Sequence, residues 1–475
     1  MTHCARHTGR RRAGSAVTLG CLLALLSAAC TGGPEDTQQS GQEKAPGPIV
    51  VASGLDVTGS GSVRQQLIEE WNRLHAGSKA LQAKLVELPG GADQQRSQLL
   101  GALQSGSARY DVVNLDITWI PEFAEAGLIS PMPVAETGAA DDADFIRRVH
   151  DTTVWKNRSY ARPFNTDVGL LYYRPDLLTG ADIEVDRQPN ANWTWDQLYS
   201  SVNTLGLNPV RRDDLAGWTT QLKQYEGLTV NTVEAFADAG VELTDGEGKY
   251  SSSAGELKEG LDELLDRVDQ GRVQPAATTS DETASLADFA EGRAVFLRHW
   301  PYAYGALDSL MGSKPYAVNR LPGKAVLGGQ NLAVTAGSAH ADGARALITF
   351  LTSRESERCL LDAGFAATRA SVYGSTAKPC WPRVAAALRP AGDAPKTAKG
   401  EDAAEGQGPK ARAVYIRILG AALTEAVQRP RTPYYGAFTQ VLQSHVYALL
   451  TAKRPDTAEA AEKLDAALRE VFAGR

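Results

Sequence analysis

The sequence predicts an α/β protein in which strands and helices alternate along the chain. Short apolar runs at residues 48–52, 83–88 and 110–116 have the length of buried strands. Residues 63–75 and 93–104, which lie between these runs, have the pattern of helices. Alternation of this kind indicates a layered domain with a mainly parallel sheet. Ligands of such sheets lie beyond the carboxyl ends of the strands, so Asp116, which ends the third run, is a site candidate; a helix cap is the alternative.

The first two predicted helices carry local signals of their own. The first has four apolar residues on one face, which we expect to be buried: Val63, Leu67, Trp71 and Leu74. Asp93 stands at the start of the second helix, where an aspartate is a good N-cap.

The rest of the chain continues the alternation. The stretch Arg162–Arg174 begins with turn-forming polar residues and becomes an apolar, aromatic strand at Val168–Tyr173. By pattern alone this is a core strand after a loop, although such a turn can also display a pocket residue. Two further strands are predicted at residues 294–300 and 328–336. Helices are predicted at 119–127, 193–205, 254–270, 341–352, 411–428, 436–452 and 457–472, and another begins at 225–231.

Length and charge limit the classes of function. A chain of 475 residues is long enough for two or three domains with substantial cores. The net charge is −7, and residues 1–29 contain four arginines and no acids, so the remainder is still more acidic. An acidic body is a poor partner for a nucleic-acid backbone, and we expect no nucleic-acid binding.

The N-terminus has the pattern of an exported lipoprotein. Arg10–Arg12 precedes an apolar run, Ala16–Leu26, that is short for a membrane span. Small residues then lead to Cys30, as in a bacterial lipobox. We therefore expect a signal peptide at 1–29, lipidation of Cys30 and a flexible Gly- and Pro-rich tether through residue 48. A simple secretory signal with an incidental cysteine is the alternative, and the export route stays open.

Two cysteines remain in the folded body. Cys359 and Cys380 are an even pair in an exported chain, which makes them a disulfide candidate. Two free buried thiols are the alternative.

The sequence lacks recognisable catalytic chemistry. It has no G-x-S-x-G elbow, no phosphate-binding loop and no H-E-x-x-H motif. Its seven histidines show no metal-ligand spacing, so we expect neither a metal nor a cofactor. The Trp- and Tyr-containing segments are more informative, because flat aromatic faces suit the C–H faces of sugars while acids and amides suit their hydroxyls.

Six segments in order carry a resemblance to a known family: 108–133, 161–178, 224–231, 290–304, 328–353 and 429–435. Together they resemble the family 1 extracellular solute-binding proteins of ABC sugar importers, in particular the trehalose/maltose-binding branch. The ordered set spans most of residues 48–475, and it follows a lipobox.

The resemblance implies a two-lobed α/β fold of the periplasmic-binding-protein type (type II), with a hinge between the lobes. Lobe 1 would comprise residues 48–165 plus 328–372. Lobe 2 would comprise 166–327 plus 373–475, with a mobile surface insertion at 390–410. The Arg162–Arg174 stretch would then be the first crossing between the lobes.

The same resemblance implies a ligand site in the cleft. Asp116 and Asp167 would accept hydrogen bonds from sugar hydroxyls, and Asn165 would lie beside them. Trp300 and Tyr302 would form a stacking platform. The remaining implied ligand-binding residues are Arg429 as a donor, with Tyr225 and Glu226 in secondary roles. Gln330 departs from the family, because relatives commonly have Trp after the paired glycines, and this change puts one stacking wall in doubt.

The resulting hypothesis is a non-enzymatic, lipid-anchored receptor on the outer face of the cell membrane. It would be a monomer that captures a saccharide between its lobes and delivers it to ABC permease subunits. Two alternatives remain. The scaffold could bind a non-sugar solute such as a polyol or a glycerol phosphodiester, or the chain could be a secreted carbohydrate-active enzyme that uses two cleft acids.

Overall fold

The structure is a computed structural model that describes residues 47–474 with short gaps. The gaps are residues 56–61, 107–108, 134–138, 184–192, 208, 212, 270, 313, 375 and 389–408. The predicted signal peptide, Cys30, most of the tether and nearly all of the 390–410 insertion therefore lie outside the described residues. In the part that is described, no helix combines the length and the apolar character needed to cross a membrane.

A five-stranded sheet forms the first half of the body, in the order β2-β1-β3-β11-β6. Its strands are β1 (Ile49–Gly54), β2 (Ala83–Leu88), β3 (Val112–Asp116), β6 (Arg162–Val168) and β11 (Leu327–Val334). β1 is parallel to β2 and β3, whereas β11 is antiparallel to β3 and β6. The sheet is thus mixed, and the predicted parallel arrangement holds only for its first three strands.

Helices cover both faces of this sheet. Because side chains alternate along a strand, Val112 and Val113 enter two separate clusters of buried residues. One face packs against α1 (Val63–Leu74), α12 (Ala341–Leu351), α13 (Arg354–Asp362) and α14 (Pro382–Ala387). The other face packs against α2 (Ala92–Ser105) and α3 (Ile120–Glu125).

Three details differ from the sequence analysis. Leu74 was predicted to be buried but is 46% exposed. The face of α1 that packs against the sheet contains Arg64 and does not contain Leu74. Asp93 is not an N-cap; Gly91 holds that position, and the Asp93 carboxylate accepts a hydrogen bond from the backbone N–H of Glu226. Residues 382–387, assigned to lobe 2, pack on α1 beside the first sheet.

The disulfide candidate forms a bond in the structure. Cys359 of α13 is joined to Cys380, which lies just before α14. The bond therefore ties α14 to α13 and explains why this segment stays with the first sheet.

A four-stranded sheet forms the second half, in the order β10-β7-β9-β8. Its strands are β7 (Leu170–Tyr173), β8 (Ala216–Thr219), β9 (Ala294–His299) and β10 (Ala317–Arg320). Its helices are α6 (Pro175–Thr179), α7 (Trp195–Thr204), α8 (Glu226–Asp238), α9 (Ala254–Arg267), α10 (Glu282–Glu291), α11 (Ala303–Leu310), α16 (Tyr435–Leu450) and α17 (Thr457–Phe472). α8, α9, α16 and α17 pack together as a helical group. We call the elements of the first sheet lobe 1 and those of the second sheet lobe 2.

Smaller elements complete the body. They are α4 (Ala139–Asp142), α5 (Arg147–Asp151), the ribbon β4 (Val154–Trp155) and β5 (Arg158–Ser159), and the 3-10 helices at Lys79–Leu81, Pro275–Thr279 and Ala370–Tyr373.

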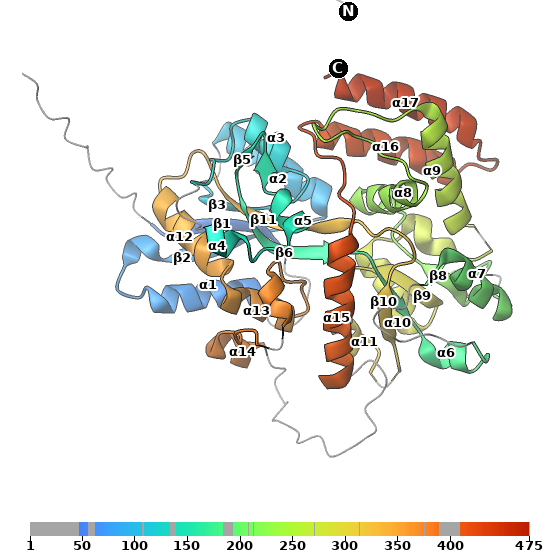
Figure 1. Cartoon of the computed structure of the whole chain (residues 1–475), viewed down its shortest axis with the longest axis horizontal. Coiled ribbons are helices and arrows are strands. Elements are labelled where there is room, and N and C mark those ends of the chain that lie inside the picture. The colour runs from blue at the N-terminus through green and yellow to red at the C-terminus, as the bar shows by residue number, and fades with distance from the viewer. Residues whose placement is uncertain are drawn as a thin grey trace, which may run out of the picture. The chain divides into compact units, whose positions relative to one another are not determined.

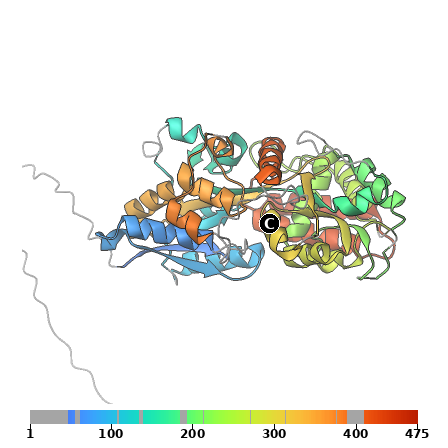
Figure 2. The same cartoon turned by 90° about the horizontal axis from the view of Figure 1, so that it is seen from below.

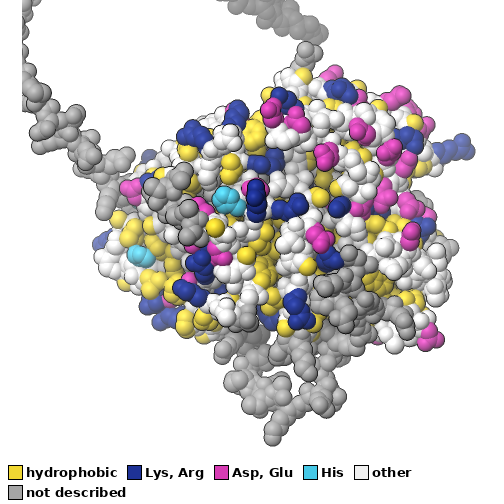
Figure 3. Space-filling model, viewed as in Figure 1, with side chains coloured by type: hydrophobic (Ala, Val, Ile, Leu, Met, Phe, Trp, Pro, Cys, Tyr) yellow, Lys and Arg dark blue, Asp and Glu magenta, His cyan; other side chains and the backbone are white. Residues whose placement is uncertain are grey.

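The acidic side chains visible in Figure 3 gather mainly over lobe 2, around α9 and α17.

Three segments connect the lobes. β6 of lobe 1 passes into β7 of lobe 2 through Gly169 alone, so the stretch predicted as one strand is two strands in two sheets. β11 returns from lobe 2, and its start is joined to the third segment by a hydrogen bond from Leu327 N to Val427 O. α15 (Pro409–Glu425), which leads to Val427, contacts both β6 and β10 and lies between the two groups of elements (Figures 1 and 2).

Candidate functional site

A row of polar side chains crosses lobe 1 where its strands end. Asp116 of β3, Gln330 of β11 and Asn165 of β6 are direct neighbours in the sheet register. Residues opposite one another on antiparallel strands point to the same face, so these three side chains stand side by side. Asp167 lies two residues beyond Asn165 on the same face, opposite Gly328. Four of the predicted ligand-binding residues therefore form one polar surface.

Asp167 has an unusual environment for a carboxylate. Its Oδ1 atom is buried and makes no hydrogen bond to any other described residue. Burial raises the pKa of Asp167 to about 7, and nearby Arg64 opposes this shift. A buried acceptor without a donor is costly, so this atom is suited to a ligand that supplies one.

Two aromatic residues from lobe 2 follow β9 and approach this surface. The ring of Trp300 reaches Gly328, where an added Cβ would lie 3.3 Å from Trp300 and 3.1 Å from the side chain of Asp167. The absence of a side chain at Gly328 thus makes room for the indole beside the carboxylate. Tyr302 packs edge-on against the ring of His299, with 5.1 Å between centroids.

Glu282 holds the aromatic wall in place. Its carboxylate accepts hydrogen bonds from the Tyr225 hydroxyl at 2.7 Å and from Trp300 Nε1 at 3.4 Å. The guanidinium of Arg298 lies over the Trp300 ring, 4.0 Å from its centroid. Tyr225 is therefore linked to Trp300 through the carboxylate of Glu282.

Arg429 bridges the two lobes. One of its guanidinium nitrogens donates to Asp116 of lobe 1 at 3.0 Å, and the other donates to Glu226 of lobe 2 at 2.6 Å. Glu226 also accepts from the hydroxyls of Tyr435 and Thr439. Asp116 and Arg429, both predicted to face a sugar, thus bind each other in this structure.

The charge state of the bridge follows from burial. Desolvation raises the pKa of Glu226 to about 7, although Arg429 acts in the opposite direction. The pKa of Arg429 is raised further above its ordinary range by Asp116 and Glu226, which outweigh its desolvation. Arg429 therefore remains a cation held between two acids.

Two residues at the site were not singled out from the sequence. Arg64 is buried in lobe 1 and donates to both Gln330 and Asn165. Its signal was present, because an arginine stands on the apolar face of the first helix. Glu282 begins α10 and had no signal of its own, since its partners lie 57 and 18 residues away.

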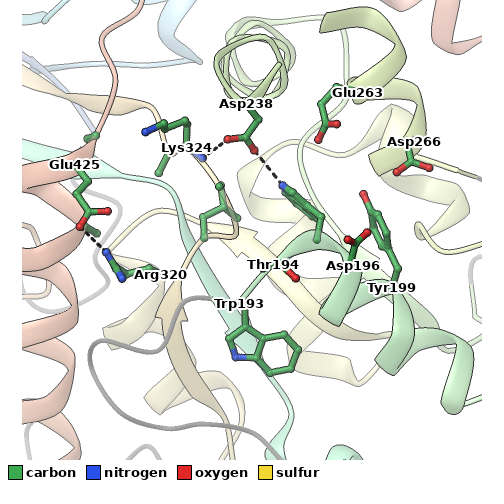
Figure 4. A pocket seen from close by; sticks show the side chains of 16 residues that line it. Trp193, Thr194, Asp196, Tyr199, Asp238, Glu263, Asp266, Arg320, Lys324 and Glu425 are labelled. Atoms are coloured by element: carbon green, nitrogen blue, oxygen red, sulfur yellow. Dashed lines mark hydrogen bonds and ion pairs between the residues drawn. The ribbon is translucent and has the colours of Figure 1, made fainter. Parts of the chain in front are cut away.

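A separate pocket lies between lobe 2 and the end of α15. It measures about 540 Å³ and contains none of the nine predicted ligand-binding residues. Figure 4 shows Asp238 bonded to Trp195 and to the backbone of Lys324, and Glu425 paired with Arg320. Arg267 also pairs with both Asp238 and Glu263. Within the described residues, no group of three His, Cys, Asp or Glu side chains is arranged to hold a metal ion.

Comparison with known proteins identifies the family. Residues 56–358 match the model of the bacterial extracellular solute-binding proteins, which is more than half of the chain. The chain belongs to this family. The resemblance found in the sequence is thereby confirmed, and homologous binding proteins, not enzymes, are its relatives.

Curated relatives carry related names. A probable ABC transporter-binding protein of Deinococcus radiodurans is 29% identical over 306 residues, covering 61% of this chain and 70% of the relative. A mannitol-binding protein of Pseudomonas aeruginosa is 24% identical over 298 residues, covering 58% of this chain and 65% of the relative.

Solved structures confirm the two-lobed solute-binding fold. The maltose-bound MalE3 of T. maritima superposes with a TM-score of 0.70 at 24% identity, covering 89% of this chain and 99% of that one. A ribitol complex of a solute-binding protein from Agrobacterium radiobacter gives a TM-score of 0.66 at 18% identity, covering 91% and 100%.

Proposed function

We propose that this chain is the solute receptor of an ABC importer, and that it captures a sugar or a polyol between its two lobes. The relatives named above for maltose, mannitol and ribitol support this ligand class. The relative named for an ABC transporter supports the transport partner.

The observation that carries the proposal is that the side chain of Asp167, whose Oδ1 is unpartnered, and the indole of Trp300 meet at the same glycine, Gly328. A carboxylate acceptor beside an aromatic face provides both kinds of contact that a polyhydroxylated molecule offers, hydroxyl donors and C–H faces. The ligand would complete the hydrogen bonding of Asp167 and cover the ring of Trp300. Asn165 and Gln330 would extend the polar side of the site, and Tyr302 the aromatic side.

Closure of the lobes would accompany binding. A ligand that touches Asp167 of lobe 1 and Trp300 of lobe 2 stabilises the closed arrangement in preference to an open one. The Asp116–Arg429–Glu226 bridge would also stabilise the closed arrangement, because it joins the two lobes. The permease would recognise the closed form.

The location of the receptor follows from its N-terminus. We propose cleavage after residue 29, acylation of Cys30 and attachment of a monomeric body to the outer face of the membrane. Mass spectrometry of the membrane fraction should detect acylated Cys30 as the first residue of the chain. A Cys30→Ala chain should instead be found in the soluble fraction.

A catalytic role is disfavoured by the same contacts. Asp116 is paired with Arg429 and accepts two hydrogen bonds from Thr118, so it is poorly placed to act as an acid or base with Asp167. A polyol ligand is the stronger alternative to a sugar, because Gln330 replaces an aromatic wall with an amide.

A thermal-shift screen tests the function. The clusters of buried residues found in the described part of the chain lie within residues 49–472, so the chain without residues 1–46 retains all of these clusters. Maltose, trehalose, mannitol and ribitol would be added in millimolar amounts, and at least one should raise the melting temperature. No shift with these or with a broader saccharide panel would contradict the proposal.

A further inference from the structure

The amide of Gln330 has a fixed polarity. Its Oε1 atom accepts hydrogen bonds from Arg64 Nη2 at 2.9 Å and from Asn114 Nδ2 at 2.6 Å. A guanidinium group has donors and no acceptor, so the amide oxygen and not the nitrogen must face Arg64. The chemistry of the guanidinium group therefore dictates the orientation of the amide.

Arg64 is itself held rigidly. It is 5% exposed, and its other terminal nitrogen donates to Ser53 Oγ at 3.2 Å and to Gly54 O at 2.9 Å. Its guanidinium also lies 5.1 Å from the ring centroid of Phe365. Gly54 is the last residue of β1, so α1 and β1 together fix the position of this cation at the carboxyl end of that strand.

The opposite end of the Gln330 amide faces outward. Gln330 is half-buried, and its Nε2 atom makes no hydrogen bond to another residue that the structure describes. Its neighbours in the row are the carboxylate of Asp116 on β3 and the amide of Asn165 on β6. Asn165 repeats the pattern, because its Oδ1 accepts from Arg64 at 3.4 Å.

We infer that Arg64 is a positioning residue that fixes Gln330 as a hydrogen-bond donor to the solute. The row then presents amide donors flanked by the carboxylate acceptors of Asp116 and Asp167. A hydroxyl group can accept from an amide and donate to a carboxylate at once, so the surface suits hydroxyls on neighbouring carbons. An anion is less favoured, because its charge would lie beside Asp116 and Asp167. The ligand class is therefore a neutral solute with vicinal hydroxyls.

This inference rests on the proposed function and is tested at Gln330. Gln330→Met keeps the length of the side chain and removes the donor. Gln330→Glu keeps an oxygen for Arg64 and Asn114 and also removes the donor. We expect both variants to bind maltose and mannitol at least tenfold more weakly, whichever of these the native chain binds, in calorimetry of the full-length chain in detergent. Gln65→Met on the exposed side of α1 is the matched control and should bind as the native chain does.

A double-mutant cycle tests the role of Arg64. Arg64→Met should weaken binding at least fivefold, whereas the same change in a Gln330→Met chain should weaken it by a clearly smaller factor, because only the longer contact with Asn165 is left to lose. Arg64→Lys retains a donor and should restore part of the affinity. If Arg64→Met fails to fold, the cycle is run with Arg64→Gln.

The outcomes separate the inference from the function. Native affinity in both Gln330 variants overturns the inference and leaves the receptor function standing. Equal weakening by Arg64→Met in both backgrounds shows an independent structural role and overturns the positioning role. A native chain that binds neither probe overturns the proposed function for these solutes and the inference with it.

Discussion

Asp167 is the residue on which the chemistry of the site depends. Its buried oxygen lacks a partner among the described residues, and burial raises its pKa to about 7. The carboxylate is therefore expected to be partly protonated near neutral pH. Ligand hydroxyls that donate to it would favour its ionised form.

The raised pKa of Asp167 leads to a prediction of how the unfolding free energy depends on pH. Its pKa is 3.8 as an ordinary carboxyl and about 7 in the folded chain, so the folded state holds the proton more tightly. The stabilisation is present below pH 4 and is lost as pH rises through 7. Between pH 4 and 8, ionisation of Asp167 should lower the unfolding free energy of the native chain by at most about 4 kcal/mol. Asp167→Asn should abolish this decrease, as measured by urea unfolding without ligand. An unchanged slope in the variant would show that Asp167 is not the group that titrates.

Trp300 predicts the contribution of the aromatic wall. Trp300→Ala should weaken binding by about 1–3 kcal/mol, because an indole face against the solute is removed. The matched control is Trp381→Ala, since Trp381 is also half-buried but stacks on Phe350 in lobe 1. Calorimetry should show a loss of affinity in the first variant alone. An equal loss in both would mean that Trp300 acts through stability.

For individual residues, the sequence predicted which polar side chains share the site better than it predicted their hydrogen-bond partners. Asp116, Asn165, Asp167 and Gln330 do share one surface. The pairing of Asp116 with Arg429 joins residues 313 positions apart, and no local pattern encodes such a contact. The same limit applies to Glu282.

Gly169 is the element boundary on which the lobe crossing depends. An added Cβ there would lie 2.5 Å from Oε1 of Glu234, whose buried ion pair with Arg298 has an N–O distance of 2.6 Å. The strand predicted at Val168–Tyr173 divides here, because Val168 belongs to a strand of the first sheet and Leu170–Tyr173 to a strand of the second. The pattern of apolar residues is continuous across the break, so periodicity could not locate it.

Gly169→Ala should destabilise the chain by about 1–3 kcal/mol, because the Glu234–Arg298 pair must move. The control is Gly101→Ala in α2, where no described atom other than the local helix backbone lies within 4 Å of the new methyl group. That change should stabilise the helix by up to about 1 kcal/mol. Urea unfolding measures both, and a neutral Gly169→Ala would contradict the tight crossing.

The segment between α15 and α16 supplies the cation that joins the lobes. Arg429→Met leaves the buried Glu226 and the partly buried Asp116 without their cationic partner and should cost about 3–5 kcal/mol of stability. Arg211→Met, at a pair whose arginine is 81% exposed, should cost less than about 1 kcal/mol. Chemical denaturation of the two variants compares them directly. Similar small losses would mean that the bridge does not hold the lobes.

For the molecule as a whole, the ordered motifs predicted the fold and family correctly, and local patterns predicted most helices. The mixed sheets were not predicted, because strand direction depends on where β11 and β7 enter from the other lobe. The place of α14 was also missed, since it is set by the Cys359–Cys380 bond and contacts with α1.

The central claim is that a neutral polyhydroxylated solute binds between the lobes against Asp167 and Trp300. Isothermal titration calorimetry of the chain without residues 1–46 against maltose, trehalose, mannitol and ribitol tests it most directly, with Asp167→Ala and Trp300→Ala run beside the native chain. The account predicts saturable binding of at least one solute, weakened about tenfold or more by each substitution. Native affinity in both folded variants, or no binding of any neutral polyhydroxylated solute, would contradict it.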